Sequence, residues 1–168
     1  QARQMSDAVI VVGGNHASCD PDFFNCDPID YIVVGVGKKS FRELIEQLQK
    51  GEGDAAVPGI ARTCPGSRLK YRPRGYSPED LMDGHPPRYD LVEHYREHYV
   101  VERLKMKMGF VMTAQGCTHA CSFCAIPATT GGRYLLHSPE AVVRDIALLK
   151  EIPLIRMVDA NTFGSPEA

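Results

Sequence analysis

The sequence lacks a surplus of positive charge, a long apolar run and a secretory signal. Its 19 Lys and Arg residues against 21 Asp and Glu residues give a net charge of −2, so no overall basic field indicates nucleic-acid binding. Apolar runs such as residues 8–12 are far shorter than the roughly 20 residues that span a bilayer, so we expect no membrane span. The missing signal and a regular helix-and-strand pattern predict a cytoplasmic protein with reduced thiols.

Cysteine is what the sequence does contain, and three of its six cysteines lie close together. Cys117, Cys121 and Cys124 have the spacing C-x3-C-x2-C, shortly after an apolar run at 110–112 that predicts a strand. Three thiolates on one short loop can hold an iron–sulfur cluster. Because a [4Fe–4S] cluster has four irons, three cysteines leave one iron open to a small molecule. The remaining cysteines are predicted to have no function: Cys19, Cys26 and Cys64.

Two alternatives stay open for this loop. Cys117, Cys121 and Cys124 could join His119 in a structural zinc site, since three thiolates and one imidazole suit zinc. The three cysteines could also be reduced thiols without a metal. Zinc sites usually come as two spaced cysteine pairs, and no second pair follows here. The spacing therefore favours an iron–sulfur cluster.

The cysteine spacing, with an aromatic residue before the third cysteine, resembles the signature of the radical S-adenosylmethionine enzymes; that residue is Phe123. The resemblance implies that the open iron binds the amino and carboxylate groups of S-adenosylmethionine. It also implies reductive cleavage to a 5′-deoxyadenosyl radical, with an electron donor such as a flavodoxin or ferredoxin as partner. Phe123 would lie near the adenine ring.

The first part of the chain has the pattern of an α/β protein. Residues 8–12 and 29–34 are continuous apolar runs, each followed by a glycine turn, and predict buried parallel strands. Ser40, with Glu43 three residues later, predicts a capping box at the start of a helix that Gly51 ends. Strand, glycine loop and helix in succession are typical of a parallel sheet.

This part is similar to the second half of a cobalamin-binding domain, on residues 11–18, residues 30–37 and the pair Phe41 and Leu44. The resemblance implies that Gly13 and Gly14 lie beside the nucleotide tail of cobalamin. Two features of the family are missing, because the usual Gly-Glu-Gly-Glu has lost both acidic residues and no Asp-x-His-x-x-Gly segment is present. The alternative is a Rossmann-like half domain with no ligand.

The last third of the chain predicts strand, cysteine loop, helix and strand. Residues 99–108 predict an edge strand that pairs with 110–114. Ser138 and Pro139 are typical of the cap and first residue of a helix, and 154–158 predicts the next strand. Strand–helix–strand is the unit of a β/α barrel, in which functional residues gather at the carboxyl ends of the strands.

The radical S-adenosylmethionine family carries a similar acidic-plus-Phe motif after this second strand, here Asp159 to Phe163. The resemblance implies that Asp159 and Asn161 hydrogen-bond to the amino group of S-adenosylmethionine. The alternative is that Asp159 caps the following turn, since Asp and Asn are common turn formers.

Turn-forming residues separate these two parts. Residues 60–64 and 69–72 flank a four-residue turn and predict a β-hairpin. Prolines and glycines then recur, which predicts a linker with short helices at 73–98. We therefore expect a partial cobalamin-binding-like domain at 1–72, this linker, and the start of a radical S-adenosylmethionine barrel at 99–168.

The resemblance implies an α/β fold: the C-terminal half of a Rossmann-like cobalamin-binding domain, followed by the first strand–helix–strand of a truncated barrel. The chain begins at Gln1 rather than Met, so we expect a fragment that is inactive by itself. The implied cofactors are a [4Fe–4S] cluster and S-adenosylmethionine, with cobalamin in the full-length protein, and no side chain is assigned a catalytic role.

The subfamily includes the anaerobic magnesium-protoporphyrin IX monomethyl ester oxidative cyclases, and we expect oxidoreductase chemistry of that kind, with a porphyrin as substrate. One alternative is a cobalamin-dependent radical methyltransferase. The other is a non-enzymatic, zinc-stabilised α/β module that binds a partner.

Overall fold

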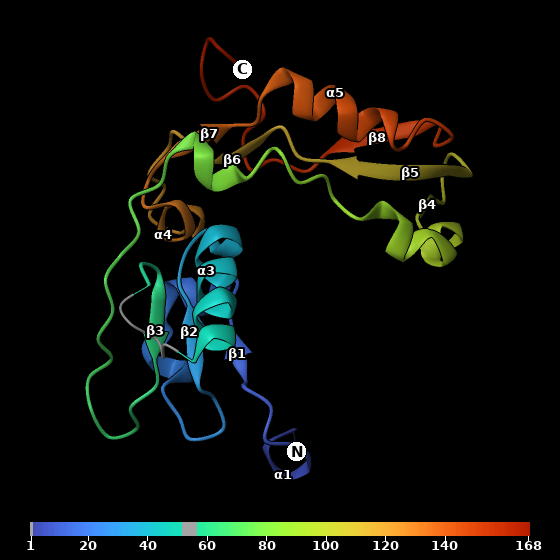
Figure 1. Cartoon of the computed structure of the whole chain (residues 1–168). Helices are drawn as coiled ribbons and strands as arrows, with labels where there is room; N and C mark the ends of the chain where they lie inside the picture. The colour runs from blue at the N-terminus through green and yellow to red at the C-terminus, as the bar shows by residue number, and fades with distance from the viewer. Residues whose placement is uncertain (1, 52–56) are drawn as a thin grey trace.

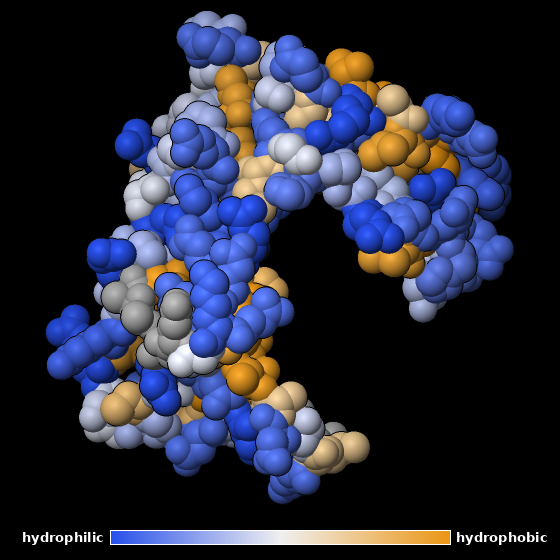
Figure 2. Space-filling model, in the orientation of Figure 1, coloured by the Kyte–Doolittle hydropathy of each residue, from blue (hydrophilic) through white to orange (hydrophobic). Residues whose placement is uncertain are grey.

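Figure 1 shows the chain as a computed structural model, which describes residues 2–51 and 57–168. The fold is α/β with mixed sheets: a three-stranded sheet in the first part of the chain, a second three-stranded sheet, and a two-stranded ladder between them. The two parts form an arch, and the space-filling view shows an open bay between the first part and the far end of the second (Figure 2). No helix in the described ranges is long and apolar enough to cross a membrane.

The first sheet has the strand order β1-β2-β3. Strand β1 (Val11–Val12) is parallel to β2 (Tyr31–Val33), as the sequence predicts, whereas β3 (Ile60–Arg62) is antiparallel to β2. Alternate residues of β2 enter two different cores, because successive side chains of a strand point to opposite faces. On one face, Ile32 packs with Ala17 and Leu69. On the other face, Tyr31 and Val33 pack with Leu44, which lies on the long helix that follows β2.

The predicted hairpin at 60–64 and 69–72 is wrong for most of its length. A single bridge joins Ala61 to Tyr71, while β3 pairs with β2 over three residues. Pairing with β2 buries Ile60 and Ala61 in the two cores, which a solvent-exposed hairpin would not do.

The helices of the first part are short except for one. They are α1 (Ala2–Met5), α2 (Asn15–Cys19), the 3-10 helix η1 (Pro21–Phe24) and α3 (Gly37–Lys50). Helix α3 begins three residues before the predicted Ser40, and the predicted capping box does not form. The Ser40 hydroxyl is buried and donates to the Pro58 carbonyl at 2.8 Å, and Glu43 pairs with Arg74 instead. Gly51 ends α3 as predicted, in the left-handed conformation (φ 69°).

The linker contains two 3-10 helices, η2 (Pro78–Leu81) and η3 (Tyr89–His98). It is attached to the first part by Arg74, whose side chain is 9% exposed. The Arg74 guanidinium pairs with Glu43 of α3 and with the buried carboxylate of Asp80, 3.5 Å away. Removing one partner of a buried ion pair leaves an uncompensated charge.

An Arg74→Met variant is therefore expected to lose about 3–5 kcal/mol of unfolding free energy, measured by urea denaturation. The matched control is Arg88→Met, because Arg88 forms an exposed pair with Asp90 at 2.6 Å, and water screens such pairs so that they add little to stability. Equal losses in the two variants would contradict a role for Arg74 in fastening the linker.

The second sheet has the order β4-β5-β8. Strand β5 (Met106–Val111) is parallel to β8 (Leu154–Met157), and α5 (Pro139–Ala147) connects them, which confirms the predicted strand–helix–strand. The Ser138 hydroxyl caps α5 by accepting from the Ala141 amide at 3.2 Å. The predicted edge strand at 99–108 is too long: β4 covers only Val100–Val101, and β5 already begins at Met106.

A two-stranded ladder follows β5, and the sequence does not predict it. Strand β6 (Ala114–Gly116) is antiparallel to β7 (Tyr134–Leu136), and α4 (Ile126–Thr130) lies in the loop between them. The ladder closes the base of the loop that carries Cys117, Cys121 and Cys124. In Figure 1 the loop and α4 lie directly above the first part of the chain, and α4 contacts α2.

Candidate functional site

The cysteine loop begins at Gly116, whose backbone conformation (φ 89°) is one that residues with side chains rarely adopt. A Cβ atom at Gly116 would lie 2.0 Å from the Arg133 carbonyl oxygen on the opposite side of the ladder. Glycine therefore allows the two ends of the loop to approach closely, and this close approach fixes the position of Cys117, the first residue of the loop after β6.

The three cysteines lie on one loop but are not gathered around a common point. Cys117 and Cys124 are half-buried, and each sulfur accepts a backbone N–H at 3.5 Å, from His119 and Ile126 respectively. Cys121 is exposed. In the described part of the chain no three His, Cys, Asp or Glu side chains are placed to hold one metal ion, so neither the cluster nor the zinc alternative is preformed.

The donor set nevertheless fits an iron–sulfur cluster. Three thiols within eight positions, two of them already accepting N–H···S hydrogen bonds, are the ligands and the supporting contacts that such clusters use. Asn161 also lies here, with its Nδ2 atom 3.8 Å from the Cys117 sulfur. Phe123 projects from the loop and is 90% exposed. The assignment of these residues to cofactors remains a prediction.

Asp159 is held by long-range contacts with a turn far upstream, which the alternative of a cap on the following turn does not include. Its Oδ1 accepts the amides of Thr113 and Ala114 at 2.7 and 3.0 Å, and its Oδ2 accepts the Thr113 hydroxyl at 2.5 Å. Burial would raise the pKa of Asp159, but these hydrogen bonds outweigh it and hold the pKa below its ordinary value. Asp159 thus fastens the turn between β5 and β6, directly before the cysteine loop.

A cavity of about 340 Å³, named here the central cavity, lies between the glycine turns of the first part and the base of the cysteine loop. From the first part it is lined by Gly14, Asn15, Gly35 and Val36; from the second by Met112, Ala114, Gln115, Gly116, Ile126, Thr129, Thr130, Val158 and Ala160. The structure thus brings predicted residue Gly14 and the cysteine loop to one space. Gly13 lines a neighbouring, more apolar cavity of about 420 Å³ with Val11, Val33 and Phe41.

Gly35 is a residue of this site that sequence reasoning did not select. A Cβ at Gly35 would lie 1.6 Å from the Tyr76 hydroxyl, which donates to the Val34 carbonyl at 3.2 Å and accepts the Val36 amide at 3.1 Å. The Gly-Val-Gly sequence after β2 indicates that another group approaches the backbone closely there. That group is the Tyr76 side chain, which lies about forty residues further along the chain and has no local sequence signal.

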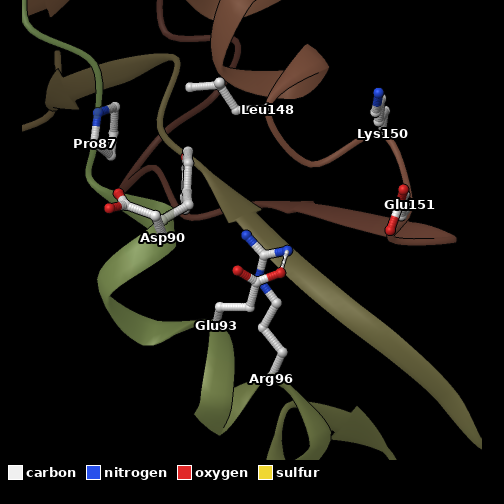
Figure 3. Close-up of a pocket in the computed structure, with 8 residues that line it drawn as sticks. Pro87, Asp90, Glu93, Arg96, Leu148, Lys150 and Glu151 are labelled. Carbon is white, nitrogen blue, oxygen red and sulfur yellow. Dashed lines mark ion pairs between the residues drawn. The ribbon is translucent and has the colours of Figure 1, made fainter.

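Another cavity, of about 300 Å³, lies between η3 and the residues that follow α5 (Figure 3). Charged side chains surround it, and Glu93 and Arg96 pair across 3.8 Å. Its lining is Pro87, Tyr89, Asp90, Glu93, Arg96, Leu148, Lys150 and Glu151, which includes neither a cysteine nor a residue of the glycine turns. We assign it no part in the site.

The chain has the fold of a part of two solved radical S-adenosylmethionine enzymes that hold cobalamin. It matches, over 95% of its length and 32% of the other chain, the radical S-adenosylmethionine methyltransferase TsrM from Kitasatospora setae with cobalamin and a [4Fe–4S] cluster bound (TM-score 0.73, 24% identity). It also matches the cobalamin-dependent enzyme OxsB with aqua-cobalamin and S-adenosylmethionine bound (TM-score 0.68, 21% identity, 95% of this chain and 22% of the other).

Two curated relatives are a methyltransferase and a methylase by name. An uncharacterized methyltransferase of Pyrococcus horikoshii is 31% identical over 142 residues, and the hopanoid C-3 methylase of Methylococcus capsulatus is 30% identical over 135 residues. These matches cover 83% and 80% of this chain but only 30% and 24% of the relatives. No family model matches the sequence.

These comparisons correct one expectation and support another. The curated relatives named above favour the methyltransferase alternative, and they give no support to the oxidative cyclase or to a porphyrin substrate. The neighbours hold cobalamin, a [4Fe–4S] cluster and S-adenosylmethionine, consistent with the three cofactors that the sequence predicts.

Proposed function

We propose that this chain is part of a cobalamin-dependent radical S-adenosylmethionine methyltransferase, with the parts expected from the sequence at 1–72, 73–98 and 99–168. The observation that carries the proposal is the central cavity, because one space is lined by both a glycine turn of the first part and the base of the cysteine loop. An enzyme in which two large cofactors act on one substrate needs both cofactors beside the same cavity.

In this proposal the side chains bind and orient rather than react. Cys117, Cys121 and Cys124 hold the cluster, and Phe123 covers the adenine of S-adenosylmethionine. Gly14 leaves room for cobalamin, because it lines the cavity and a Cβ there would meet no atom within 4 Å in the described structure. When bound together, the cofactors supply the methyl group, and an external electron donor of the flavodoxin or ferredoxin kind supplies electrons.

Asp159 acts on the site through the backbone. By accepting the amides of Thr113 and Ala114 it fixes the turn that leads into the cysteine loop, while Asn161 approaches the Cys117 sulfur. Both residues would therefore position the cluster, with Asn161 the better placed of the two to reach S-adenosylmethionine.

The test is anaerobic reconstitution of the chain with iron and sulfide, followed by EPR of the reduced protein and by titration with hydroxocobalamin. We expect a [4Fe–4S]⁺ signal that changes when S-adenosylmethionine is added, and a saturable change in the cobalamin absorption spectrum. Stoichiometric zinc in place of iron would favour the zinc-stabilised module. A cluster without cobalamin binding would overturn the cobalamin-dependent part of the proposal.

A further inference from the structure

The segment after β8 folds back onto the ladder at the base of the cysteine loop, and its residues 161–164 are named here the Asn161 loop. Tyr134, the first residue of β7, holds this loop by its hydroxyl group. The hydroxyl donates to the carbonyl oxygens of Asn161 and Thr162, at 3.0 and 3.1 Å. It also accepts the Gly164 amide at 3.1 Å. One phenol, which has a single O–H and can accept as well, thus binds three of the four residues.

Gly164 shows how closely these groups pack. A Cβ atom at Gly164 would lie 2.7 Å from Cζ of Tyr134 and 3.1 Å from Nδ2 of Asn161. The tyrosine ring could not move aside without breaking the hydrogen bonds of its hydroxyl group. Backbone, ring and side-chain amide are therefore in contact, and this packing restricts where the Asn161 amide can lie.

The amide that is held in this way points at a predicted cluster ligand. Nδ2 of Asn161 donates to the Cys117 sulfur at 3.8 Å. The N–H groups of His119 and Ile126 that reach Cys117 and Cys124 belong to the backbone of the cysteine loop itself. The Asn161 amide instead comes from a separate segment, so its contact with the sulfur depends on how that segment is fastened.

A donor at this sulfur would change the redox properties of a cluster. Hydrogen bonds to the sulfurs are among the features that set the reduction potential of an iron–sulfur cluster. Reduction adds negative charge, and an N–H group directed at a ligand sulfur stabilises the reduced state more than the oxidised state. The Asn161 donor should therefore raise the reduction potential and make the cluster easier to reduce.

We propose that Tyr134 is a positioning residue, which fastens the Asn161 loop so that the Asn161 amide donates to the Cys117 sulfur and raises the reduction potential of the cluster. This inference rests on the proposed function, since it requires a cluster at Cys117. It depends neither on cobalamin nor on the identity of the methyl acceptor.

The first test is a redox titration of the reconstituted chain, followed by the [4Fe–4S]⁺ EPR signal. Tyr134→Phe removes only the hydroxyl group, and we expect a more negative midpoint potential because the Asn161 loop is released. Asn161→Leu, which has a similar shape but no N–H, should shift the potential at least as far. In the Asn161→Leu background Tyr134→Phe should add no further shift. A further shift there would overturn the positioning role, because Tyr134 would then act by another route.

Tyr89→Phe is the matched control. The Tyr89 hydroxyl also donates to a backbone carbonyl, that of Phe110 at 3.0 Å, but Tyr89 lines the cavity of Figure 3, which contains no cysteine. The potential should not change in this variant. A cluster whose potential is the same in the original chain and in Tyr134→Phe would overturn this inference and leave the proposed function standing. A chain that takes up no cluster would overturn both.

A second test examines the contact without metal, in the reduced chain labelled with ¹⁵N-asparagine. The side-chain amide signal of Asn161 is assigned by its absence from the Asn161→Leu variant. We expect its exchange with water to be at least about fivefold faster in Tyr134→Phe, the order of factor to which one net hydrogen bond corresponds, and unchanged in Tyr89→Phe. Equal exchange rates in the original chain and in Tyr134→Phe would overturn the proposal whether or not a cluster forms.

Discussion

Replacing Gly116 by Ala is expected to destabilise the chain by about 2–5 kcal/mol and to prevent assembly of the cluster. The new Cβ would lie 2.0 Å from the carbonyl oxygen of Arg133, the residue directly before β7, and a backbone atom cannot rotate away as a side chain can. The left-handed conformation of Gly116 adds about 1–2 kcal/mol of strain, and the steric overlap about 1–3 kcal/mol. Urea unfolding measures the stability, and iron content after reconstitution measures the assembly.

The control is Gly132→Ala in the same loop. Gly132 is also left-handed (φ 73°), but a Cβ there meets no atom within 4 Å in the described structure. It should therefore cost only the conformational strain of about 1–2 kcal/mol and still permit a cluster. If Gly116→Ala costs no more than Gly132→Ala, the close approach at the base of the cysteine loop does not matter for the fold.

Local signals in the sequence predicted the elements that depend on neighbouring residues. Ser138 and Pro139 begin α5, and Gly51 ends α3, because caps are decided within one helical turn. The three cysteines were found by their spacing alone. The pairing of β1 with β2 and of β5 with β8 followed from apolar runs separated by a helix or a loop.

What the sequence did not reveal depends on contacts between distant residues. Ser40 and Glu43 have the pattern of a capping box, yet Pro58 and Arg74 bind them instead. Asp159 finds its partner forty-six positions upstream, at Thr113. The ladder of β6 and β7 has only three residues in each strand, too few to give a periodic signal. The site therefore depends on long-range partners that no local pattern contains.

A Cys121→Ala variant is expected to lose the cluster while keeping the fold, and this is the change that most directly tests the site. Cys121 is exposed, so its substitution should alter the free energy of unfolding by less than about 0.5 kcal/mol. If its thiolate is one of three ligands, however, its removal should abolish the [4Fe–4S]⁺ EPR signal. Iron analysis, EPR and circular dichroism on the same sample measure both properties.

Two controls decide between the open alternatives for the loop. Cys26→Ala removes an exposed cysteine of the first part and should leave the cluster intact. His119→Ala separates the metals, because a zinc site of three cysteines and one histidine would lose its fourth ligand, whereas a cluster held by three cysteines would be unaffected. Since His119 contributes a backbone N–H to the Cys117 sulfur, and alanine retains it, the variant removes only the imidazole. Loss of the cluster in His119→Ala would assign the imidazole to the metal and reject the three-cysteine site.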